Sequence, residues 1–96
     1  MIKHIVMWKF KDGVTDADKQ EVKRQLEVLE GIVPEAIEIE VGLDVLKSDQ
    51  SFDMVLNSTF QSLEDLKIYA AHPEHVKVGA FLKTLVCERV AVDYEV

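Results

Sequence analysis

Apolar and polar residues alternate over positions 2–10, and this two-residue period is typical of a β-strand. The same period recurs in three later segments, residues 37–41, 53–60 and 86–95. In the first of these segments, the acidic residues Glu38 and Glu40 alternate with Ile37, Ile39 and Val41. One face of this strand should therefore be buried and the other acidic, as in an edge strand that is protected by charge.

Residues 15–33 instead show the period of an amphipathic helix. Thr15, followed three residues later by Asp18, is typical of a helix N-terminus, because the threonine side chain can accept a hydrogen bond from the first turn. Gly31 and Pro34 are typical of the C-terminal end. The apolar side of this helix is formed by Val22, Leu26, Leu29 and Val33.

A second helical segment, residues 62–85, should break in its middle. Ser62 predicts its N-terminus in the same way as Thr15 does for the first helix. His72 precedes Pro73 and is therefore driven out of the helical region, whereas the proline suits the first turn of a new helix. In that new helix His75 falls on the same stripe as Val78, Leu82 and Leu85, so its imidazole should point inward.

The predicted order is β-α-β-β-α-β, the ferredoxin-like α+β arrangement in which helices cover one face of a four-stranded antiparallel sheet. In a monomer the other face would be polar, but both faces of these strands contain apolar side chains. We assign Ile5, Met7, Val55, Cys87 and Ala91 to one face and Val6, Trp8, Leu56 and Val90 to the other. A second copy of the chain should therefore cover the open face by two-fold symmetry, which gives a homodimer.

Composition removes several classes of partner from this picture. The 96 residues, 48% of them hydrophobic, predict a single domain over residues 1–96. The net charge of -7 argues against nucleic-acid binding, and no apolar run approaches the roughly 20 residues that span a membrane. The first residues lack the pattern of a signal peptide, and Cys87 is the only cysteine, so no internal disulfide can form. We therefore expect a cytoplasmic protein. We also expect Cys87 to be a small buried apolar residue.

An ordered set of short segments extends over the whole chain: Ile2-Lys-His-Ile-Val, Lys9-Phe-Lys-Asp-Gly13, Val41-Gly42, Ser58-Thr-Phe60, Tyr69 to His75 with its His-Pro-x-His core, and Val92-Asp-Tyr-Glu95. This set resembles the stress-responsive dimeric α/β-barrel (Dabb) family. The resemblance implies a ferredoxin-like protomer whose sheet packs against that of its partner to form a dimeric α/β barrel. Some plant members are polyketide cyclases that use no cofactor, so the resemblance implies none here. In those cyclases residues that match Tyr69 and His75 form the catalytic pair, and a histidine that matches His4 lines the site.

The residue types fit such chemistry, because removal of a proton beside a carbonyl needs a base and a donor for the developing oxyanion. A neutral imidazole suits the first task and a phenol the second. We therefore interpret His75 as the base, Tyr69 as the oxyanion donor, and His4 as a polar partner that orients one of them. In an unbroken helix, positions 69 and 75 would diverge by about 120°, so the break at Pro73 must bring the two side chains together.

The predicted pocket lies between the sheet and the helices of one protomer, and its ligand is expected to be a small carbonyl compound. Its wall is formed by Trp8, Val22, Leu26, His72, Val78 and Leu82. The plant cyclases have aromatic residues in the first helix, where this chain has Val22, Lys23 and Leu26. Because the indole of Trp8 also projects toward the same space, a long polyketide substrate is not expected.

Simpler interpretations of the histidines stay open. His4 can be a hydrogen-bonded core residue, and His72 can bond the backbone at the helix junction. In that case the chain is a non-enzymatic structural or stress-related barrel dimer, while a cofactor-free monooxygenase has only the shared architecture in its favour. His72 and His75 lie three apart, but without a cysteine partner or a His-Glu-x-x-His pattern we expect no metal site.

Overall fold

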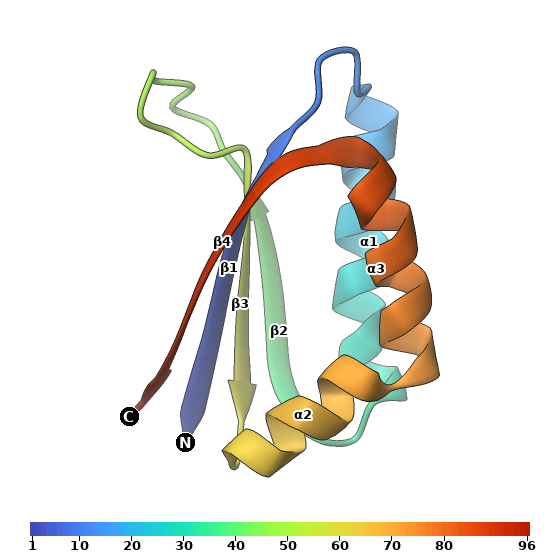
Figure 1. Ribbon diagram of the computed structural model, residues 1–96, viewed down its shortest axis with the longest axis vertical. Coiled ribbons are helices and arrows are strands. Elements are labelled where there is room, and N and C mark those ends of the chain that lie inside the picture. Colours follow the sequence, from blue (N-terminus) through green and yellow to red (C-terminus); the bar gives the residue numbers. More distant parts are fainter.

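The computed structural model describes all of residues 1–96. Its elements follow one another as β1 (Ile2–Phe10), α1 (Asp16–Ile32), β2 (Ala36–Leu43), β3 (Met54–Phe60), α2 (Leu63–Ala71), α3 (Pro73–Leu85) and β4 (Val86–Glu95). The strands form one antiparallel sheet in the order β2-β3-β1-β4, and all three helices lie on the same face of it (Figure 1). The predicted ferredoxin-like α+β fold is therefore confirmed, with β2 at one edge. None of the helices is long and apolar enough to cross a lipid bilayer.

Local sequence signals set most of the helix ends. The side chain of Thr15 accepts a hydrogen bond from the backbone N–H of Asp18 (3.1 Å), and Ser62 caps α2 in the same way. Helix α1 runs through Gly31 to Ile32, and the buried Val33 then closes it, with its N–H bonded to the Leu29 carbonyl. The helix therefore ends between Gly31 and Pro34, the two residues that indicated its C-terminal end.

The helix break falls at His72, as predicted. Its backbone is extended (φ -62°, ψ 134°), which the following proline favours, and it ends α2 and begins α3. The His72 Nδ1 atom accepts a hydrogen bond from the backbone N–H of Glu74 at 3.1 Å. His72 therefore lies at the junction of the two helices, where its ring caps the N-terminus of α3.

The core lies between the sheet and the helices, where 18 apolar side chains are buried. Residues from the sheet and from the helices meet there, and Val22, Val33 and Phe60 are fully closed to solvent. Burial of each such side chain contributes roughly 1.5–3 kcal/mol relative to leaving it exposed. This packing fixes the distance between the sheet and α3.

A β-bulge at Cys87 changes which residues of β4 face the helices. Phe10 pairs with Val86, but Lys9 pairs with Glu88, so Cys87 is the extra residue. Val86 packs against the core, whereas Cys87 is exposed. The expectation of a buried Cys87 was therefore wrong.

Beyond the bulge the alternation is reversed relative to the predicted faces. Ala91 pairs with Val6 and shares its helix-facing side, while Val90 pairs with Met7 and lies on the open side. Our assignment of Ala91 to the open face and Val90 to the helix face was thus wrong. Strict counting of residues fails here because an inserted residue moves every later side chain to the other face.

A second bulge acts in β2. Ala36 pairs with Phe60 and Glu38 with Thr59, so Ile37 is the extra residue and is 46% exposed. The predicted burial of Ile39 and Val41 is confirmed, but that of Ile37 was wrong. Ala36 is buried in the core instead of Ile37.

The sheet face opposite the helices stays apolar and open. The side chains that share this face in the register include Ile5, Met7, Val55, Val90, Val92 and Tyr94. Several of them are well exposed, among them Val92 (56%) and Tyr94 (46%). The prediction of apolar side chains on both faces is therefore confirmed, with a different set of β4 residues.

Candidate functional site

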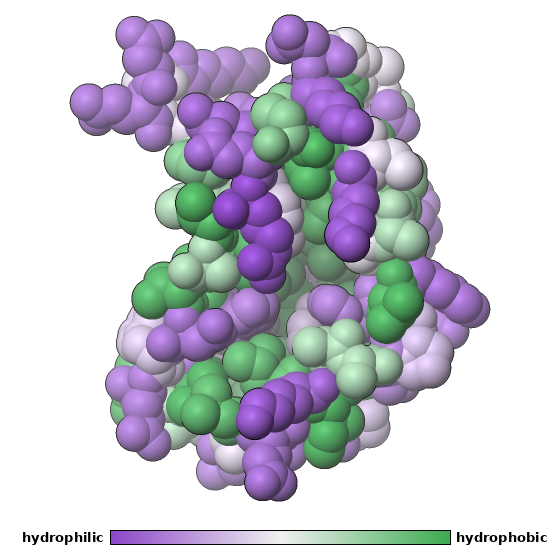
Figure 2. All heavy atoms as spheres, in the orientation of Figure 1, coloured by the Kyte–Doolittle hydropathy of each residue, from purple (hydrophilic) through white to green (hydrophobic).

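A cavity of about 380 Å³ lies between the sheet and α3. Of the 14 residues that line it, 8 are hydrophobic, and they come from strands β1, β3 and β4 and from all three helices. In the space-filling view the hollow between sheet and helices is apolar at its floor and flanked by hydrophilic residues (Figure 2). A cavity of this size and character suits a small organic molecule.

Three of the six predicted wall residues line this cavity, namely Trp8, Leu26 and Leu82. The indole of Trp8 forms part of the wall and leaves the space open. The other three lie elsewhere, since Val22 and Val78 are core residues and His72 is turned to the backbone of α3.

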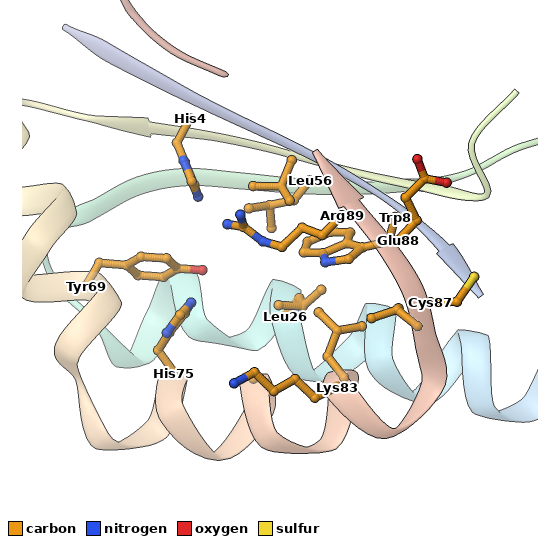
Figure 3. A pocket seen from close by; sticks show the side chains of 14 residues that line it. His4, Trp8, Leu26, Leu56, Tyr69, His75, Lys83, Cys87, Glu88 and Arg89 are labelled. Atoms are coloured by element: carbon orange, nitrogen blue, oxygen red, sulfur yellow. The ribbon is translucent and has the colours of Figure 1, made fainter. Parts of the chain in front are cut away.

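The two predicted catalytic side chains of the helical segment meet in the cavity. The Tyr69 and His75 ring centroids are 4.5 Å apart, with an interplanar angle of 57°. Tyr69 comes from α2 and His75 from α3, so the break at His72 brings together side chains that one continuous helix would separate. In Figure 3 the Tyr69 hydroxyl and the His75 ring point into the same space, opposite His4.

Tyr69 offers a hydrogen-bond donor that the fold itself does not use. The residue is 1% exposed, and its ring packs against Phe60 at a centroid distance of 5.0 Å. Its hydroxyl is buried and has no hydrogen-bond partner. Burial raises the pKa of Tyr69 to about 12, so the phenol is neutral at physiological pH and keeps its proton.

His75 is held in one tautomer. Its Nδ1 lies 3.0 Å from the carbonyl oxygen of Ala70, which can only accept, so Nδ1 carries the proton and Nε2 is left with its lone pair. Burial lowers the pKa of His75. The hydrogen bond to Ala70 acts in the opposite direction, and the electrostatic effects of His4, Arg89 and His72 lower the pKa further. The ring is therefore a neutral base at pH 7.

His4 joins these groups from β1. Its Nδ1 is hydrogen-bonded to a carboxylate oxygen of Asp93, its partner in the β1–β4 register. The ring also makes an edge contact with Phe60, at 6.4 Å between centroids. His4 is thus hydrogen-bonded to β4 and not to Tyr69 or His75. This bond fixes its position in the cavity wall.

Several cavity residues were not foreseen from the sequence. Asp93 lies outside the cavity lining but bonds His4, and its place opposite His4 depends on the bulge in β4, which the sequence pattern does not reveal. Gly79 and Lys83 follow His75 at i+4 and i+8, so the helical stripe points to them as well. Cys87, Glu88 and Arg89 complete the lining at β4. The bulge determines where they point.

The histidines do not combine into a ligand set for a metal. His72 and His75 direct their Nδ1 atoms to different backbone groups. No group of three or more His, Cys, Asp and Glu side chains is arranged to hold a metal ion. The polar groups of the cavity are instead suited to proton transfer and hydrogen bonding.

Comparisons with known proteins agree with this geometry. The model of the stress responsive A/B barrel domain matches residues 2–96. Olivetolic acid cyclase of Cannabis sativa is 30% identical over 95 residues, which are 97% of this chain and 94% of that protein. A stress-response A/B barrel domain-containing protein of Arabidopsis thaliana is 35% identical over 98% of the chain, which spans only 36% of that protein.

Among solved structures, a Bacteroides fragilis protein described as dimeric, with a ferredoxin-like fold and unknown function, is 37% identical. It superposes with a TM-score of 0.86 over 99% of this chain and 95% of that chain. With the family match over almost its entire length, the chain belongs to the stress-responsive A/B barrel (Dabb) domain family.

Proposed function

We propose that this protein is a homodimer that binds a small carbonyl compound in each protomer and removes a proton beside the carbonyl, as a cyclase or lyase does. The observation that carries this proposal is the meeting of Tyr69 and His75 in one cavity. Tyr69 supplies a hydrogen-bond donor that the fold does not use, and His75 supplies an unprotonated ring nitrogen. A relative that is named a cyclase adds support.

In the proposed step, Nε2 of His75 takes a proton from the carbon next to the carbonyl, and the electron pair of the C–H bond moves into an enolate. The hydroxyl of Tyr69 donates a hydrogen bond to the oxygen on which the negative charge develops. The base contributes roughly 10²–10⁴-fold in rate, and the oxyanion donor roughly 10²–10³-fold. The enolate can then attack a second carbonyl or expel a leaving group, and His75 returns the proton.

Dimerisation is proposed through the open sheet face. Met7, Val92 and Tyr94 are exposed there, and a contiguous apolar face of a sheet is unfavourable in water. Solved relatives are described as dimeric. Because the cavity lies on the helix side, a partner on the open face would leave it accessible.

Hydrogen–deuterium exchange tests the proton transfer without knowledge of the natural substrate. Acetophenone, a neutral ketone, is incubated with the protein in D₂O, and loss of its methyl proton signal is followed by NMR. We expect exchange above the buffer rate in the wild type and a loss of roughly 10²-fold or more in His75→Gln. Tyr94→Phe, a change in the only other tyrosine, is the control and should keep the wild-type rate. Exchange at the buffer rate, or an unaltered rate in His75→Gln, would contradict the proposal.

A further inference from the structure

Two positively charged side chains line the cavity without an ion-pair partner, although the chain as a whole has a net charge of -7. Lys83 and Arg89 both line the cavity, and neither forms an ion pair. The only other arginine, Arg24, is exposed and bonded to Glu21 through two nitrogen atoms. In a chain with 18 acidic residues, an arginine that lines a cavity and has no ion-pair partner needs an explanation.

The bulge at Cys87 is what directs Arg89 toward the cavity. Beyond it Arg89 pairs with Trp8 and shares its helix-facing side. If the pairing of Phe10 with Val86 continued without the extra residue, Arg89 would oppose Met7 on the open face. Bulges are known to re-aim side chains beside functional sites.

The carboxylates near Arg89 are already engaged. Asp93, on the same side of β4, bonds His4, and Glu88, which also lines the cavity, forms an ion pair with Lys9 at 3.9 Å. The charge of Arg89 nevertheless acts on His75, because Arg89 is among the groups that lower the pKa of this histidine. Figure 3 shows the guanidinium directed toward the space between His4 and Tyr69.

We propose that the cavity takes a keto acid, whose carboxylate pairs with Arg89 while its carbonyl faces Tyr69 and His75. The guanidinium matches a carboxylate through two parallel hydrogen bonds, and Lys83 adds a second positive charge. The apolar walls fit the carbon skeleton between the two groups. The carbonyl end of this assignment rests on the proposed function, whereas the carboxylate end rests on the two unpaired cations, and chiefly on Arg89.

Calorimetric titration with benzoylpropionate and with its neutral methyl ester tests the carboxylate end. The two molecules share the aryl ketone and differ in charge. The wild type should bind the acid about tenfold more tightly than the ester, because a charged hydrogen-bonded pair is lost with the ester. Arg89→Leu should remove this preference, and Arg24→Leu, which deletes the same charge outside the cavity, should retain it.

Equal binding of acid and ester by the wild type would overturn the assignment, as would a preference that survives in Arg89→Leu. Failure of both molecules to bind would also overturn it. None of these results depends on proton transfer, which the exchange of neutral acetophenone measures separately. A failure of the keto acid assignment is thus distinguishable from a failure of the proposed function.

Discussion

Replacement of Tyr69 by phenylalanine should separate the stability of the fold from the function of the cavity. The substitution removes one oxygen atom and keeps the ring that packs against Phe60 and His75. In the native fold this oxygen is buried without a hydrogen-bond partner. The hydroxyl therefore costs desolvation free energy and receives no compensating bond from the protein.

The size of the effect follows from that missing bond. A buried polar group without a partner costs about 1–3 kcal/mol, so Tyr69→Phe should raise the free energy of unfolding by about 1 kcal/mol. For a domain of this size, that corresponds to a rise in melting temperature of about 4–8 °C. At the same time, loss of the oxyanion donor should lower the rate of ketone exchange by roughly 10²–10³-fold.

Chemical denaturation and thermal melting at one fixed protein concentration measure the stability change, since dimer stability depends on concentration. Tyr94→Phe again serves as the control, because it removes the same oxygen atom from a residue outside the cavity. A fall in unfolding free energy of 1 kcal/mol or more in Tyr69→Phe would refute the reasoning. It would mean that the hydroxyl has a structural partner and is not held free for a ligand.

Two further predictions concern charge and assembly. Ketone exchange should fall as the pH drops through the lowered pKa of His75, so the acidic limb of the profile should lie below the usual value of about 6.5. Because the unfolded chain protonates this histidine at higher pH than the fold does, stability should also decrease as the pH falls from about 6.5 through the folded pKa. Melting temperatures against pH should show a weaker decrease in His75→Gln, and identical curves would contradict this assignment. Met7→Glu places a charge on the open sheet face and should halve the mass found by sedimentation velocity, whereas Lys67→Glu on α2 should not. A wild-type monomer, or a dimer that survives Met7→Glu, would exclude this interface.

The sequence predicted the elements well because their signals are local. Thr15 and Ser62 cap helices in the expected way, and Pro73 breaks the second helical segment where backbone sterics require it. Face assignments failed at Ile37 and beyond Cys87, because each bulge adds a residue that no short-range pattern reveals. Periodicity gives the face of a residue only as long as the register is regular.

The candidate site was predicted in its residues more than in its geometry. His4, Tyr69 and His75 were all named, and they line one cavity. Their arrangement depends on the angle between α2 and α3, which the sequence does not specify. Asp93 and Arg89 were missed for a related reason, since their roles follow from the strand register and the bulge.

The central claim is that His75 presents an unprotonated Nε2 to the cavity. NMR of the ring nitrogens measures this directly, with His75→Gln used to assign the signal among the three histidines. The structure predicts a neutral ring at pH 7 that carries its proton on Nδ1 and titrates below about 6.5. A proton on Nε2 of the neutral ring, or an imidazolium at pH 7, would contradict the account.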